Sequence, residues 1–159
     1  MGLRIKLAEK KLKLDEIDRK ILNLLQEDAR RSFKDMAQRA GVSEATVFVR
    51  VRKLVKNGVI KAFKAILDPA IVGKGTLAFI MVKANPSEYT NVLQKLKDMR
   101  DVYEIYDVTG PNYAILKVRT ESPERLAELI DQVGAIRGVE STETSMVLRN
   151  VKEELSLKL

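Results

Sequence analysis

Cysteine, histidine and tryptophan are absent from this chain of 159 residues, and only 5% of its residues are aromatic. Without cysteine, disulfides and thiolate chemistry are excluded, which argues against a stapled extracellular fold. General acid–base catalysis at neutral pH usually recruits histidine, nucleophilic catalysis often uses cysteine, and no glycine-rich phosphate loop is present. We therefore expect a protein that is not an enzyme and that uses neither a cofactor nor a metal.

Long apolar runs are also missing. No stretch approaches the roughly 18 apolar residues that span a bilayer, so a membrane partner is not expected. Residues 1–13 mix leucine and isoleucine with lysine and arginine, and they lack the apolar core of a secretory signal. The sequence thus predicts a cytoplasmic protein.

Positive charge is concentrated in the first half of the chain. Residues 1–74 contain 18 lysines and arginines against 9 acidic residues, a net charge of +9. Residues 75–159 contain 11 against 13, a net charge of −2. This asymmetry predicts a polyanionic partner for the first half, and DNA or RNA fits better than a membrane surface.

The segment 33–60 has the pattern of two short helices joined by a tight turn. Ala37 leaves room for a second helix to cross, Gly41 can take the positive φ that the turn requires, and Val47 fills the crossing. Ser43 is a good N-cap for the second helix, which is expected from about Glu44 to Asn57. The pattern predicts a helix-turn-helix.

Flanking segments complete this first domain. Asp15 and Asp18 form a capping pair that predicts a preceding helix. The strand-like residues 59–67 follow the motif and end at Asp68-Pro69, where proline disfavours further regular structure. We interpret residues 1–68 as a winged helix-turn-helix. The alternative is a three-helix bundle whose basic face is only solvated.

A basic helix with a free N-terminal turn suits the major groove of DNA. The residues that we expect to contact DNA lie on the second helix of the motif or beside it: Ser43, Thr46, Phe48, Arg50, Arg52, Lys53, Arg31 and Lys61. Alternatives stay open for three of them. Arg50 could pair with a neighbouring carboxylate, and Ser43 could serve only as a cap. Phe48 could pack on a thymine methyl group or on the N-terminal arm, at Leu3, Ile5 or Leu7.

The second half has a different period. Strands are expected at 76–83, 102–109, 113–119 and 139–148, with one amphipathic helix after Asn85-Pro86 and another after Ser122-Pro123. The order β-α-β-β-α-β is that of a ferredoxin-like sheet backed by two helices, so the chain as a whole is α+β. We place this domain at 75–150 and treat 151–159 as a charged tail. Strand 76–83 is apolar on both faces, which predicts a cover on each.

An RNA-recognition module has the same element order. That module stacks bases on aromatic residues within a basic or glycine-containing strand motif, which is missing here, and the second half carries a net negative charge. Duplex DNA is therefore the favoured nucleic acid.

The order of these motifs resembles the Lrp/AsnC family of transcription regulators. The resemblance rests on the segments Leu14–Leu25, Ser43–Leu54, Gly58–Ile60, Ile66–Pro69, Val108–Gly110 and Ile136–Glu140, which together cover nearly the whole chain. It implies that the first domain binds operator DNA, while the second pairs subunits into dimers, often assembled into tetramers or octamers. It also implies a pocket between paired domains that senses an amino acid or a related metabolite.

Five residues match positions that border or contact the effector in relatives: Thr109, Gly110, Asp131, Thr142 and Thr144. Their ordinary roles are equally clear, since Asp131 would face outward on an amphipathic helix and alternating threonines are good strand formers. The chain also departs from the family pattern. Many relatives place a tyrosine and an aspartate shortly after the hairpin glycine, whereas here Pro111, Asn112 and Tyr113 follow it.

Overall fold

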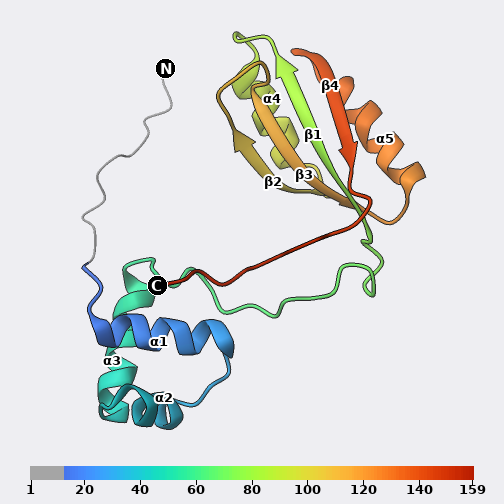
Figure 1. Cartoon of the computed structure of the whole chain (residues 1–159). Coiled ribbons are helices and arrows are strands. Elements are labelled where there is room, and N and C mark those ends of the chain that lie inside the picture. Colours follow the sequence, from blue (N-terminus) through green and yellow to red (C-terminus); the bar gives the residue numbers. More distant parts are fainter. Residues whose placement is uncertain (1–12) are drawn as a thin grey trace. The chain divides into compact units, whose positions relative to one another are not determined.

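The computed structural model describes residues 13–159, which form two compact units (Figure 1). The first unit extends to Ala65 and includes Glu153–Leu159, and the second is Ile66–Lys152. Residues 153–159, which lie within the predicted charged tail 151–159, thus belong to the first unit. The Gln26 side chain donates to the backbone oxygen of Leu157 at 3.0 Å and accepts from its N–H at 2.7 Å.

The first unit contains three helices: α1 (Glu16–Glu27), α2 (Phe33–Ala40) and α3 (Glu44–Lys56). Each begins where a side chain can satisfy free backbone N–H groups. Asp15 and Asp18 form a complete capping box at α1, and Ser32 and Ser43 cap α2 and α3. The predicted starts of all three helices are therefore confirmed.

The predicted crossing of α2 and α3 is present. Gly41 adopts φ +70° at the end of α2, Val47 is fully buried and Ala37 nearly so. Ile21 of α1 and Leu54 of α3 complete an apolar core shared by the three helices. The packing therefore fixes how α3 is presented to solvent.

The strand predicted over residues 59–67 is not formed. Residues 61–67 have no regular secondary structure and are exposed. The backbone of Val59 and Ile60 instead donates to the oxygen of Leu54, closing α3. Residues 59–67 have the apolar composition typical of a strand, but a strand needs a hydrogen-bonding neighbour, and the single sheet in the described part of the chain does not include this segment.

The second unit is a four-stranded antiparallel sheet in the order β2-β3-β1-β4. Its strands are β1 (Thr76–Ala84), β2 (Val102–Asp107), β3 (Ala114–Thr120) and β4 (Val139–Met146), and its helices are α4 (Tyr89–Lys97) and α5 (Pro123–Gly134). Both helices lie on the same face of the sheet (Figure 1). The predicted ferredoxin-like arrangement is confirmed.

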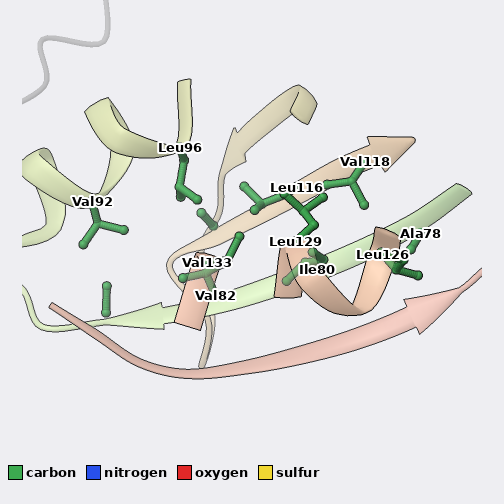
Figure 2. Close-up of a cluster of buried hydrophobic side chains, with 12 residues drawn as sticks. Ala78, Ile80, Val82, Val92, Leu96, Leu116, Val118, Leu126, Leu129 and Val133 are labelled. Carbon is green, nitrogen blue, oxygen red and sulfur yellow. The ribbon is translucent and has the colours of Figure 1, made fainter. Parts of the chain in front are cut away.

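The core of this unit lies between the sheet and the two helices. Figure 2 shows Ile80 and Val82 of β1 and Leu116 of β3 gathered with Leu96 of α4 and Leu129 of α5. Successive strand residues point to opposite faces. The alternate residues of β1, namely Leu77, Phe79 and Met81, are only partly buried on the other face. The sequence predicted that both faces of β1 are covered. The helices cover one face, and no helix of the described residues covers the other.

Candidate nucleic-acid interface

Helix α3 presents a continuous outward surface opposite its buried residues. Val47, Val51 and Leu54 pack inward, so positions on the far side of the helix follow at intervals of three and four. These outward positions are Ala45, Val49, Arg52 and Lys56, and all of them are exposed. We call these four residues the outward ridge of α3.

The first turn of α3 is stabilised by its own side chains. The Ser43 hydroxyl accepts a hydrogen bond from the N–H of Thr46 at 3.1 Å, and the two hydroxyl oxygens lie 2.8 Å apart. Ser43 is thus an N-cap, as the sequence predicted. Contact of either residue with DNA stays a prediction.

Arg50 does not point freely into solvent. Its Nη1 donates to both carboxylate oxygens of Asp15, at 2.8 and 2.6 Å, and to Oδ1 of Asp18 at 2.8 Å, leaving 26% of the side chain exposed. A backbone hydrogen bond from Asp18 and the Arg50 guanidinium lower the pKa of Asp15, which keeps the pair charged. This is the carboxylate pairing considered as the alternative from sequence. It fastens the start of α1 to the middle of α3.

Phe48 has partners that the sequence did not predict. Its ring meets Phe33 edge-on, with centroids 5.8 Å apart, and the Arg52 guanidinium lies 5.5 Å from the ring centroid. The i, i+4 spacing of Phe48 and Arg52 could have predicted their contact from sequence. The contact of Phe48 with Phe33 of α2 depends on the angle at which α2 and α3 cross. The alternative partners Leu3, Ile5 and Leu7 lie outside the described residues.

Arg31, predicted to anchor a phosphate, takes part in an ion-pair network before α2. It donates to Asp35 at 2.6 Å and to Glu27 at 3.1 Å, and only 17% of its side chain is exposed. The hydrogen bond that Arg31 donates to Asp35 contributes most to raising the pKa of Arg31, and the negative charges of Asp35 and Glu27 raise it further. Acid and base follow one another every four residues, a pattern that could have predicted this pairing from sequence.

Other cations remain available on the surface. Arg52, Lys53 and Lys56 on α3 and Lys61 beyond it are exposed, and none of them forms a salt bridge with any residue from 13 to 159. Beside them, an open groove of about 480 Å³ lies between α3 and the start of α1. It is lined by Asp15, Ala45, Thr46, Val49, Arg50 and Lys53.

The five residues proposed to bind an effector lie at three places on the second unit. Thr109 and Gly110 are exposed in the turn between β2 and β3, and Asp131 is exposed on α5. Thr142 and Thr144 are half-buried on β4, paired with residues of β1 that face the helices. The hydroxyl of Tyr89, which the sequence did not single out, donates to Asp107 at 3.0 Å beside this turn. Burial, then this hydrogen bond, raises the pKa of Tyr89.

Within the described residues, no group of side chains has the composition of a metal site, and no helix is long and apolar enough to cross a membrane. The polar side chains predicted to bind an effector thus lie at the hairpin turn of the second unit, on α5 and along β4.

Comparison with known proteins decides the family. Residues 14–55 match the model of the AsnC-type helix-turn-helix domain, and residues 77–157 match that of the Lrp/AsnC ligand binding domain. The chain belongs to the Lrp/AsnC family. Like its relatives, it is a DNA-binding transcription regulator, and residues 14–55 are its helix-turn-helix domain.

Its Lrp/AsnC relatives include proteins of archaea and bacteria. The HTH-type transcriptional regulator FL11 of Pyrococcus horikoshii is 40% identical over 92% of this chain and 97% of its own length. Among solved structures, E. coli AsnC has a TM-score of 0.87 at 32% identity, covering 92% of this chain and 99% of that one. A transcriptional regulator from Neisseria meningitidis, solved as a complex with L-Met, has a TM-score of 0.86 at 25% identity, covering 91% and 96%.

Proposed function

We propose that α3 enters the major groove of operator DNA, with Arg52 and Lys53 beside it on the phosphate backbone. The observation that carries this proposal is the exposed cationic surface of α3 within a domain of the AsnC helix-turn-helix type. Phosphate contacts fix the position of a protein on the duplex. Ser43 caps the same helix, Thr46 and Phe48 lie on it and Lys61 follows it, so these residues complete the proposed DNA interface.

Arg50 and Arg31 take a different place in this proposal. Each is already held by two carboxylates, so contact with a phosphate would have to compete with a charged hydrogen bond. We assign Arg50 the role of holding α3 against α1, where Asp15 is the exposed partner that a phosphate could displace.

The salt dependence of binding tests the phosphate contacts. Binding releases counterions, so affinity should fall steeply as salt rises, and the slope of log K against log salt should shrink by about one for Arg52→Ala or Lys53→Ala. Lys97→Ala, an exposed lysine at the end of α4, is the matched control and should leave the slope unchanged. Equal slopes for all three variants and the parent chain would contradict this interface.

We further propose that the protein binds as a dimer or a larger homo-oligomer. Two-fold pairing of the second unit would present two copies of α3 to half-sites about one helical turn, roughly 10 base pairs, apart or a multiple of that. The uncovered sheet face, with Phe79 and Met81 partly exposed, supports pairing through this unit.

We also propose that an amino acid or related metabolite binds at Thr109, Gly110, Asp131, Thr142 and Thr144 of paired subunits. The support is the ligand-binding family model over this unit and the L-Met complex of the Neisseria relative. Asp131 is the residue that could accept hydrogen bonds from an α-ammonium group. The departure at Pro111, Asn112 and Tyr113 favours an effector unlike the common amino acids, or regulation by protein concentration alone.

Calorimetric titration with each of the twenty amino acids tests the effector site. Saturable binding by the parent chain that is lost in Asp131→Ala, and kept in the exposed Asp98→Ala, is the expected outcome. Heats equal to dilution for all twenty would remove the amino-acid proposal and leave regulation by concentration.

A further inference from the structure

The N-terminal half of the outward ridge is apolar. Ala45 and Val49 lie one turn apart on the exposed face of α3, and Val49 is 62% exposed. An aliphatic side chain held in water gains when a partner covers it, about 0.8 kcal/mol per buried methyl or methylene group. Here the exposed methyl groups stand at the end of α3 that a recognition helix turns toward base edges.

The hydrogen-bonding side chains around these methyl groups are already engaged. Arg50 is bound to Asp15 and Asp18, and the hydroxyls of Ser43 and Thr46 lie against each other. Moving Arg50 to a base edge would give up its hydrogen bonds to Asp15 and Asp18, and turning either hydroxyl away would break the contact between Ser43 and Thr46. Contact of a base with the methyl groups of Ala45 and Val49 breaks no hydrogen bond within the protein. These methyl groups are therefore the part of this turn that can contact a base without rearrangement.

The charge around the methyl groups specifies their partner. Arg52, Lys53 and Lys56 follow on the next turns, exposed and without a salt bridge to any described residue. A partner must therefore be a polyanion that also carries apolar groups between its charged strands. Duplex DNA meets both conditions, because the C5-methyl group of thymine projects into the major groove. Unmodified RNA carries uracil, which lacks that methyl group, and its major groove is too narrow for side chains.

We propose that Val49, supported by Ala45, reads thymine methyl groups and thereby sets part of the operator sequence. This inference rests on the proposed entry of α3 into the major groove. It assigns Arg50 to positioning and gives base discrimination at this turn to van der Waals contact.

Thymine-to-uracil replacement tests the inference directly. Duplexes that the full-length protein retains are first selected from a random pool, and each thymine of a selected site is then replaced in turn by deoxyuridine. This change removes only the methyl group and keeps every base-pairing atom. We expect a loss of about fourfold in affinity at one or two positions of each half-site, the equivalent of one buried methyl group.

The variant Val49→Ala identifies the residue responsible. It should bind thymine and uracil duplexes equally at one of those positions, and alanine at an exposed helical site should not impair folding. Val55→Ala, on the same helix and 45% exposed outside the ridge, is the matched control and should keep the full penalty.

The possible outcomes distinguish a failure of major-groove entry from a failure of thymine-methyl recognition. If no duplex is selected above background, the proposed entry of α3 into the major groove fails. If duplexes are selected but uracil binds as tightly as thymine at every position, DNA binding stands and methyl recognition is overturned. A uracil penalty that persists unchanged in Val49→Ala would overturn the assignment to Val49.

Discussion

At the scale of the residue, Gly138 occupies a position where the backbone is left-handed and where there is no space for a Cβ atom. It adopts φ +99° where the chain enters β4, and a Cβ atom there would lie 2.4 Å from Cβ of Glu88 and 3.1 Å from Val92. Its backbone oxygen accepts a hydrogen bond from the N–H of Asn85 at 2.7 Å. The absence of a side chain thus lets β4 pass close to the start of α4.

Gly138→Ala should therefore lower the free energy of unfolding of the second unit by about 3 kcal/mol. The left-handed backbone contributes roughly 1 to 2 kcal/mol and overpacking adds a similar amount. Gly73→Ala is the control, because Gly73 also has positive φ, +75°, but nothing lies within 4 Å of its Cβ position. Urea denaturation of both variants measures the difference, and equal losses would show that the contact with Glu88 is not limiting.

At the scale of the element, a buried carboxylate joins three segments of the second unit. Asp101, 2% exposed, precedes β2 and accepts from Lys74 ahead of β1 at 2.9 Å and from Arg125 of α5 at 3.0 and 3.1 Å. Burial acts to raise the pKa of Asp101, but the hydrogen bonds from Lys74 and Arg125 outweigh it and the net pKa is lowered. Asp101 is therefore ionised at neutral pH and holds these segments together.

This shift predicts how stability depends on pH. A carboxyl whose pKa is lower in the folded state stabilises fully above its unfolded pKa, about 3.9, and loses that contribution as pH falls through the folded value. The free energy of unfolding of the parent chain should thus fall below about pH 4. Asp101→Asn should lose about 3 kcal/mol at pH 7 and show a shallower acid decline. Denaturation between pH 2 and 7 measures both, with exposed Asp98→Asn as control. An unchanged acid slope in Asp101→Asn would contradict this role.

At the scale of the whole molecule, the sheet of the second unit has one face without helices. Phe79 pairs across strands with Lys117 and Ser145, and Met81 with Ile115 and Glu143, so these side chains share that face. Phenylalanine and methionine left partly exposed at the centre of a sheet gain from a second cover. A second copy of the same sheet supplies one by two-fold pairing.

Light scattering of the full chain at micromolar concentrations tests this pairing. The parent chain should be a dimer or larger, and Met81→Glu should shift it toward the monomer because a charge would be buried at the interface. Asn91 is exposed on α4, which covers the opposite face of the sheet. Asn91→Glu is therefore the control and should leave the assembly unchanged. A monodisperse monomer for the parent chain would overturn the pairing.

The sequence alone determined what depends on neighbours three or four positions apart. Asp15, Ser32, Ser43 and Ser122 each accept a hydrogen bond from a backbone N–H three residues on, so the starts of four helices were readable from residue type. The continuous apolar run at 76–83 and the turn composition of residues 110–112 likewise predicted strands of the sheet from local sequence.

Only the tertiary structure decided what depends on residues far apart in the chain. Arg50 binds Asp15, 35 positions away, and Asp101 binds Lys74, 27 positions away. No local sequence pattern predicts either pair. Residues 59–67 have a strand-like composition, yet strand formation depends on a neighbour to share hydrogen bonds. Composition sets what a segment can form, whereas the partners that the fold brings within reach decide which of those contacts are made.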